Sequence, residues 1–363
     1  MKVIDGSRGE GGGQIVRTVM GLAIITGTPV RIENIRAKRE KPGLMRQHLK
    51  SVQAAAQVCE GELRGATLQT SELEFVPGRL RGGDYEFVVE TAGSVGLVLQ
   101  TVIPPFIAAG CAARIAVEGG SHARMAPPYD FLQHAYGRAV REMGFRFALH
   151  FERYGFYPEG GARLVAEIEP ADTSRTTAEG PDQTSKPLTT APVARRIEFD
   201  GGTSSRSLHV TSILSGVPDA IAQRQHDTLR ADLEDLGLEM MFETRHVASR
   251  SSGHVLHVRL DGIPVTEVFT AFSERGRPAE QLAAALGAEV RAFVETGAPV
   301  GPHLADQLLV LLSVGAGGVF RTSALTLHSR TMLELIPEFL DVDFDVRDAD
   351  DGTMLVEVAK TWV

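Results

Sequence analysis

The segment GGGQIVRTVMGLAIITG (residues 11–27) starts with glycines, continues as an apolar helix and ends in glycine. Two later segments share this pattern: GSVGLVLQTVIPPFIAAG (93–110) and GPHLADQLLVLLSVGAGG (301–318). A helix on a protein surface keeps a polar face, and these three segments are too apolar for that. We therefore expect all three helices to lie inside the fold.

The elements around each apolar helix are also alike. A short strand follows it (29–35, 113–120 and 318–327), then a second helix and a pair of strands. A strand precedes the helix in at least two of the copies. The sequence thus predicts a βαβαββ unit three times, and a repeated unit is itself a fold signal. The expected fold class is α/β, of the α+β type, with the three units forming one large domain.

The second and third units are separated by a stretch of different character. Residues 171–192 are polar and rich in Thr, Pro and Ser, which is typical of a linker. A strand (195–200), a helix near 218–236 and three further strands follow. We predict a small inserted α/β domain at 185–276 and a large domain at 1–184 and 277–363. A helix at about 279–295 would return the chain to the third unit.

Composition restricts the class of protein. Of 363 residues, 43% are hydrophobic and 23% are charged, as in ordinary globular proteins. No apolar run is long enough for a membrane span or a signal peptide, and Cys59 and Cys111 lack the spacing of metal ligands. These features predict a cytoplasmic protein that does not bind membranes.

The formal net charge of −9 argues against a protein that coats long nucleic acids. A local basic patch would still allow binding of one strand end. Residues 31–50 contain such a patch, with eight Arg, Lys or His residues against two Glu. A solvated helix face is the alternative interpretation.

Three like units around one core bring their equivalent loops together. The corners between the strand and the second helix are residues 36–46, 119–128 and 327–330, and they hold most of the unusual polar residues. We expect the functional site where these corners meet.

The glycine loop from Gly9 to Gln14 precedes a helix, and the free N–H groups of a helix N-terminus favour phosphate. The loop matches neither the Walker A motif nor G-x-G-x-x-G, so a tight turn is an equal alternative. Glu10 is more informative. A carboxylate in a phosphate-binding corner repels the phosphate unless a divalent metal lies between them.

The first and third corners offer further chemistry. Side chains that can converge on a phosphate follow the first strand; they are Arg36, Arg39, Arg46, Gln47 and His48. In the third corner His328 follows a strand, begins a helix and shares its unit with Asp306 and Gln307. An unprotonated imidazole can attack phosphorus, although a lone histidine is often structural. His122 fits an ordinary loop residue equally well.

Several motifs occur in an order that resembles a known family. They are GEGGGQIVRT, RAKREKPGLMRQHL, RGGDYEF, TAGSVGLVLQTVIPP, APPYDF, YGFYPEGG and HLADQL. Over nearly its whole length the chain resembles the RNA 3′-terminal phosphate cyclases. This resemblance implies the same fold of three units with an inserted domain. It also implies ATP-dependent conversion of an RNA 3′-phosphate to a 2′,3′-cyclic phosphate. The intermediates would be a covalent histidine–AMP and an RNA-3′-pp-5′-A, and the cofactor a divalent metal, Mg or Mn.

The resemblance also implies roles for individual residues. His328 matches the adenylated histidine, and Glu10 matches a metal-linked glutamate. The positions that match ATP-binding residues are Gln100, Pro128, His303, Leu304, Ala305, Asp306 and Gln307. The positions that match residues for the RNA end or the triphosphate are Arg17, Arg36, Arg39 and Gln47.

The chain departs from the family pattern at three places. His303 replaces a frequent tyrosine, Met332 replaces an asparagine, and residues 121–125 read SHARM instead of a Thr-Asx-Asn-Pro-like run. These departures bear on rate and substrate preference. A non-catalytic, cyclase-like ribosome-assembly protein is the alternative function, but such proteins lack the histidine. Enolpyruvyl transferases have related units, but more of them and no such insertion. A homodimer is left open.

Overall fold

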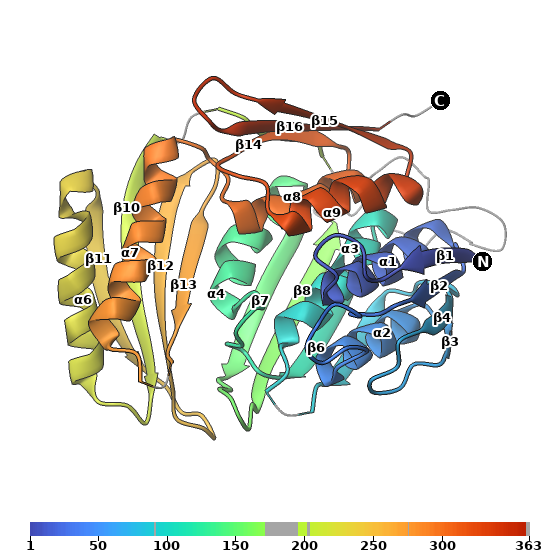
Figure 1. Ribbon diagram of the computed structural model, residues 1–363, viewed down its shortest axis with the longest axis horizontal. Coiled ribbons are helices and arrows are strands. Elements are labelled where there is room, and N and C mark those ends of the chain that lie inside the picture. Colours follow the sequence, from blue (N-terminus) through green and yellow to red (C-terminus); the bar gives the residue numbers. More distant parts are fainter. Residues whose placement is uncertain (91, 171–194, 202–203, 275, 361–363) are drawn as a thin grey trace.

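The computed structural model describes residues 1–90, 92–170, 195–201, 204–274 and 276–360 (Figure 1). The predicted linker at 171–192 lies outside these residues. Within them, no helix combines the length and the apolar character that crossing a membrane requires.

Three four-stranded sheets repeat one topology. The first contains, in spatial order, β1 (Lys2–Asp5), β2 (Val30–Glu33), β4 (Leu73–Val76) and β3 (Glu62–Arg64). The second contains β5 (Gly83–Val88), β6 (Ala113–Gly119), β8 (Ala162–Pro170) and β7 (Phe145–Arg153). The third contains β9 (Ile197–Phe199), β14 (Gly318–Thr322), β16 (Met354–Lys360) and β15 (Val342–Asp348). In each sheet the first pair is parallel and the other two pairs are antiparallel, which confirms the predicted repeat.

Each unit contributes two helical segments. The first helices are α1 (Gly13–Thr26), α3 (Val95–Ala109) and α8 (Pro302–Val314). The second are α2 (Arg46–Val58), then α4 (Tyr129–Phe131) with a π-helical turn (Leu132–Tyr136) and α5 (Gly137–Glu142), and α9 (Leu327–Leu335) with a 3₁₀ turn (Ile336–Glu338). Helix α3 packs against both α1 and α8, and all three belong to the main hydrophobic core. Their predicted position inside the fold is confirmed.

The inserted segment forms a fourth sheet with its own core. Its elements are β10 (Ser204–Ser215), α6 (Asp219–Leu233) with a 3₁₀ turn (Glu234–Leu236), β11 (Glu239–His246), β12 (Gly253–Ile263), β13 (Glu267–Phe272) and α7 (Ala279–Thr296). The strand order is β11-β10-β12-β13. Both helices pack against this sheet in a second hydrophobic cluster. Figure 1 shows this part at one end of the molecule, coloured yellow to orange.

Two elements lie on the other side of the domain limits expected from the sequence. Strand β9, expected in the inserted domain, pairs in parallel with β14 in the third sheet. It supplies the parallel edge strand that β1 and β5 supply in the other units. Helix α7, expected to return to the large domain, buries Leu286 and Val290 in the core of the insertion. The insertion therefore interrupts the third unit after its first strand, while the domain limits themselves stay a prediction.

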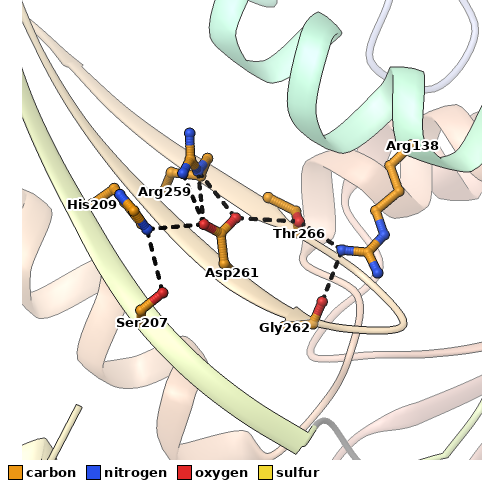
Figure 2. A network of polar contacts seen from close by, with 7 residues as sticks. All are labelled: Arg138, Ser207, His209, Arg259, Asp261, Gly262 and Thr266. Carbon is orange, nitrogen blue, oxygen red and sulfur yellow. Dashed lines mark hydrogen bonds and ion pairs between the residues drawn. The ribbon is translucent and has the colours of Figure 1, made fainter. Parts of the chain in front are cut away.

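Polar contacts attach the insertion to the second unit (Figure 2). Arg138 on α5 donates hydrogen bonds to the carbonyl of Gly262 at 2.9 Å and to Oγ1 of Thr266 at 3.0 Å. Thr266 in turn donates to Asp261, which also pairs with Arg259 and His209. The turn between β12 and β13 is thus fixed against α5. Because β13 begins in this turn, its position relative to the three units is fixed as well.

Candidate active site

A cavity of about 750 Å³ lies where the three units meet the insertion. This volume lies within the range of roughly 300–1,000 Å³ that is usual for small-molecule sites. All three predicted corners reach it, through Arg39, Arg124 and His328, while β13 and α7 contribute an apolar wall. The predicted site residues that line it are Glu10, Arg17, Arg36, Arg39, Gln47, His48, Gln100, Pro128, His303, Asp306, Gln307 and His328.

Three predicted site residues do not line the cavity. Arg46 is half exposed and pairs with Glu90 on the surface. Leu304 and Ala305 are fully buried in the main core. In a helix, residues three and four apart share one face, so His303 faces the cavity together with residues 306 and 307. Leu304 and Ala305 lie between these positions and face the core. The binding roles of Arg46, Leu304 and Ala305 stay predictions.

The glycine loop packs directly against α9. Gly9 has a φ of +51°, and a Cβ atom there would lie 2.0 Å from Oγ1 of Thr331. The backbone N–H of Glu10 donates to the same Oγ1 at 3.4 Å. A Cβ at Gly13, in the first turn of α1, would lie 2.2 Å from Nε2 of His48. Glycine at the two positions lets the loop approach α9, and the first turn of α1 approach His48.

Glu10 lies between two side chains from different corners. Its carboxylate forms an ion pair with Arg39. Its Oε2 lies 4.0 Å from Nδ1 of His328. The glycine loop, the first corner and the third corner therefore bring a carboxylate, a guanidinium and an imidazole to one place.

His328 stands in the first turn of α9, and Asp306 on α8 holds that turn. Oδ1 of Asp306 accepts hydrogen bonds from Thr326 at 2.6 Å and from Ser329 at 2.5 Å. Oγ1 of Thr326 also caps the helix by accepting from the N–H of Ser329 at 3.1 Å. Burial lowers the pKa of His328 below its usual value, and the Asp306 carboxylate opposes that shift. The imidazole is therefore mostly unprotonated at neutral pH, which is the form that can act as a nucleophile.

The corner around His48 is cationic. Burial lowers the pKa of Arg17 to about 10, so this guanidinium stays charged at neutral pH. Arg36 donates to the carbonyls of Lys41 at 2.7 Å and Gly43 at 2.8 Å, which fixes the loop that carries Arg39. His48 is buried, and its burial together with the three arginines lowers its pKa to about 3. His48 is therefore neutral, and the positive charge comes from guanidinium groups, which suit phosphate oxygens.

Several buried polar atoms around the cavity have no hydrogen-bond partner among the described residues. They are Oε1 of Gln14, Nε2 of Gln100, the hydroxyl oxygen of Tyr136 and Nδ1 of His328. Leaving a buried polar atom unpaired costs about 1–3 kcal/mol, so such atoms mark places where a polar ligand binds favourably. By contrast, Gln47 is engaged: its Oε1 accepts from the N–H of Ser94, at the start of α3, at 3.3 Å.

Comparison with known proteins identifies the family. The family model "RNA 3′-terminal phosphate cyclase" matches residues 8–346. The chain belongs to the RNA 3′-terminal phosphate cyclase family. Curated relatives named RNA 3′-terminal phosphate cyclase are similar over almost the whole chain. The protein of Koribacter versatilis is 37% identical over 97% of this chain and 93% of its own length. The protein of Ralstonia nicotianae is 38% identical over 97% of this chain and 95% of its own length. The protein of Salmonella agona is 34% identical over 98% of this chain and 97% of its own length.

Some of the residues that depart from the cyclase pattern line the cavity, and others are buried away from it. Met332 is fully buried in the main core, so this change lies outside the cavity lining. His303 lines the cavity. Within residues 121–125, Arg124 and Met125 line the cavity, whereas His122 is buried and turns toward Asp130.

Some cavity residues were not singled out from the sequence. Gln14 stands where the G-x-G-x-x-G pattern would need its last glycine, which gives no sign of a binding role. Arg124, which pairs with Glu274 of the insertion, stands in a corner where the site was expected. The sequence did not indicate that Glu289 on α7 lines the cavity, because a charged residue on an amphipathic helix is normally solvated. Burial raises its pKa, and nearby His303 opposes the shift.

Proposed function

We propose that this cyclase-family protein uses ATP to convert an RNA 3′-terminal phosphate to a 2′,3′-cyclic phosphate, through AMP bound to His328. The observation that carries the proposal is the imidazole of His328 in the cavity, with a lowered pKa and its Nδ1 4.0 Å from Glu10. The names of the curated relatives support the same overall reaction.

The cavity suits the two substrates. Gln100, His303 and Gln307 would contact the adenosine part of ATP, with Pro128 beside the base. The unpartnered amide of Gln100 supports this assignment, since a bound nucleotide would satisfy it. Arg17 and Arg39, together with the N–H groups at the start of α1, would hold the phosphates of ATP and of the RNA end.

Glu10 fits a divalent cation, Mg or Mn. Its carboxylate is largely buried in a corner that otherwise carries positive charge. Hard cations of this kind take carboxylate and phosphate oxygens as ligands. Such a metal would withdraw negative charge from the phosphoryl oxygens. This chain's own groups would orient the substrate: Arg39 holds Glu10, and Asp306 holds the turn that carries His328.

The reaction would proceed in three displacements. First, an N–P bond forms between His328 and the α-phosphorus as the P–O bond to pyrophosphate breaks. Next, an oxygen of the RNA 3′-phosphate attacks the same phosphorus and displaces the imidazole. Finally, the neighbouring 2′-hydroxyl loses its proton and attacks the RNA phosphorus, and AMP leaves. The last step is intramolecular, which lowers its entropic cost. Arginines stabilise charge on the phosphoryl oxygens in each step.

The deciding experiment is intact-protein mass after incubation with ATP and magnesium. One adenylyl group should be added to the wild-type protein and should be released by acid, as expected for a phosphoramidate. The adduct should be absent from His328→Ala. His150→Ala, which removes an exposed histidine outside the cavity lining, should retain it. An adduct on His328→Ala would refute the proposed nucleophile. No adduct despite ATP binding would favour a non-catalytic binding protein.

The RNA step needs its own test. An oligoribonucleotide with a 3′-phosphate should be cyclised, and one with a 3′-hydroxyl should not react. With a 2′-deoxy nucleotide at the 3′-phosphate end, the adenylated RNA should accumulate, because the final nucleophile is missing. If the 2′-deoxy end released AMP as quickly as the ribonucleotide end, attack by the 2′-hydroxyl would be excluded.

We propose that the reaction takes place in the cytoplasm. The two cysteines are buried and unpaired, which supports a reducing compartment. A homodimer stays a prediction.

A further inference from the structure

A second cluster of chemically active side chains lies outside the lining of the cavity. It consists of His122, Asp130 and His257, and one nitrogen or oxygen of each lies within 4.8 Å of the others. Oδ2 of Asp130 lies 3.4 Å from Nε2 of His122 and 3.1 Å from Nε2 of His257. Two imidazole nitrogens therefore face one carboxylate oxygen.

The cluster joins two parts of the protein. His122 and Asp130 belong to the second unit, in the corner before α4 and in α4 itself, whereas His257 stands on β12 of the insertion. The side chains of His122, Asp130 and His257 are 0%, 13% and 3% exposed. The rings of Tyr154 and Phe156 stack on His122 with centroid distances of 5.8 and 5.5 Å. The group is thus shielded from water.

Hydroxyl groups orient both rings. Nδ1 of His122 lies 2.8 Å from Oγ of Ser121, and this hydroxyl also exchanges hydrogen bonds with the backbone of Gly155. Nδ1 of His257 lies 2.8 Å from Oγ1 of Thr270. If each Nδ1–H donates to its hydroxyl, both Nε2 atoms present lone pairs to Asp130. Metal-binding histidines have this arrangement, in which an outer hydrogen bond sets the tautomer.

Lone pairs that face a carboxylate repel it unless a cation lies between them. Nε2 of His257 is buried, and although it lies 3.1 Å from Oδ2 of Asp130 it forms no hydrogen bond with a described residue. A buried carboxylate that faces two such lone pairs is compensated poorly by these rings, and a cation between the three groups would remove the repulsion.

We propose that His122, Asp130 and His257 bind one Zn²⁺ ion, which fastens the insertion to the second unit. Two imidazole nitrogens and one carboxylate oxygen form a common zinc ligand set, with a water molecule in the fourth position. Tetrahedral zinc with bonds of about 2.0–2.1 Å separates its ligand atoms by about 3.4 Å. The two distances to Asp130 are close to that value. This site is separate from the divalent metal at Glu10, and the proposal does not depend on the proposed reaction.

The position of the cluster gives the zinc a structural role. Thr270, which orients His257, also lines the large cavity, and Pro128 lines it two residues before Asp130. An ion at the cluster would hold β12, β13 and the start of α4 together. It would thereby fix one wall of the cavity without touching a substrate.

Zinc binding to the full-length, metal-depleted protein tests the proposal. The probe is ZnCl₂, titrated against a chromophoric chelator and followed by metal analysis after gel filtration. We expect one tightly bound equivalent and a higher unfolding temperature with zinc. His257→Gln should lose at least about a hundredfold in affinity, since loss of outer-shell partners alone costs 10–100-fold. Equal zinc content in the wild type and in correctly folded His257→Gln would overturn the proposal.

Two controls separate this site from others. His209→Gln changes a histidine that also pairs with an aspartate, Asp261 at 3.1 Å, but without a second histidine in the pair (Figure 2). His328→Ala removes a histidine from the large cavity. Both variants should bind zinc as the wild type does. Loss of the tight equivalent in His328→Ala but not in His257→Gln would place the zinc in the cavity and refute the proposal.

The wild type alone also gives a decision if His257→Gln does not fold. Co²⁺ in place of Zn²⁺ should give the visible d–d bands of a tetrahedral site at one equivalent, and ZnCl₂ should remove them. Asp130→Asn, which keeps an acceptor oxygen, should weaken the bands. The absence of tetrahedral bands in the wild type would contradict the assignment.

Discussion

Oε2 of Glu10 lies 4.0 Å from Nδ1 of His328, although the first residue stands near the start of the chain and the second near its end. The contact depends on two anchors. Thr331 accepts a hydrogen bond from the N–H of Glu10, and Asp306 holds the turn that carries His328.

Glu10→Gln should slow formation of the His328–AMP adduct and weaken its dependence on magnesium. The substitution keeps the shape of the side chain but removes the charge that binds a divalent cation. The measurement is the rate of adduct formation across a magnesium titration. An unchanged magnesium midpoint would remove Glu10 from the metal site.

The rate of adduct formation should fall as pH decreases through the pKa of His328, because the protonated imidazole has no free lone pair. Burial lowers this pKa, so the fall should be centred below the usual histidine value of 6.5. The Asp306 carboxylate raises the pKa of His328, so Asp306→Asn should move the fall to still lower pH. Ser329→Ala, which removes a hydrogen bond but no charge, should reduce the rate without changing the pH at which the rate falls. Identical pH–rate profiles for the wild type and Asp306→Asn would argue against an effect of Asp306 on the pKa of His328.

Arg39→Ala should reduce kcat/KM for RNA 3′-phosphate ends by about tenfold to a hundredfold, since charge-assisted hydrogen bonds contribute about 1.5–3 kcal/mol. The fold should be retained, because Arg39 is partly exposed and such ion pairs contribute about 0–1 kcal/mol. Arg31→Ala is the matched control. Arg31 is an arginine as exposed as Arg39, and it pairs with Glu72 outside the cavity. Full activity of Arg39→Ala would exclude Arg39 from the site.

Gly9→Ala should be more damaging than Gly27→Ala. Both glycines have positive φ angles, so alanine adds about 1 kcal/mol of backbone strain at either position. Only at Gly9 does the new Cβ also meet Thr331, whereas nothing lies within 4 Å at Gly27. Unfolding temperature and adduct rate should both fall further for Gly9→Ala, and adding Thr331→Ala should restore part of the unfolding temperature. Equal effects at the two glycines would show that the contact with α9 is unimportant.

Glu267→Gln should stabilise the protein at high pH. Glu267 is buried under the first turn of α8, where it accepts from the N–H of Gly301 at 2.6 Å, and burial raises its pKa to about 8. A raised carboxyl pKa means that the folded state holds the proton more tightly than the unfolded state. The stability from this group is complete below the usual pKa of 4.5 and is lost as pH rises through 8.

The effect should be a few kcal/mol, at about 1.4 kcal/mol per pKa unit. Urea unfolding near pH 5 and near pH 9 measures it, because glutamine cannot ionise. As a control, Glu90→Gln changes an exposed glutamate and should leave the pH dependence of the unfolding free energy unchanged. A Glu267→Gln variant whose stability fell with pH as steeply as that of the wild type would contradict the assignment.

Much of the site followed from the sequence because loops that are equivalent in a repeat meet in space. Arg39 and His328 stand in equivalent corners of the first and third units, and both line the cavity. Arg46 was expected beside them, but the first turn of α2 directs it to Glu90 instead. Helix phase likewise buries Leu304 between cavity residues. Which way a side chain points depends on the packing of its helix, which a motif does not specify.

The sequence by itself determined the repeated βαβαββ units and the inward position of their apolar helices, because periodicity and hydrophobicity are local properties of the chain. Its motifs also identified the family. Only the tertiary structure decided that β9 belongs to the third sheet and that α7 packs with the insertion. It alone brought His257 to Asp130. These are pairings between segments that are far apart in the chain. Their stability comes from hydrogen bonds and buried surface that exist only once the units are assembled.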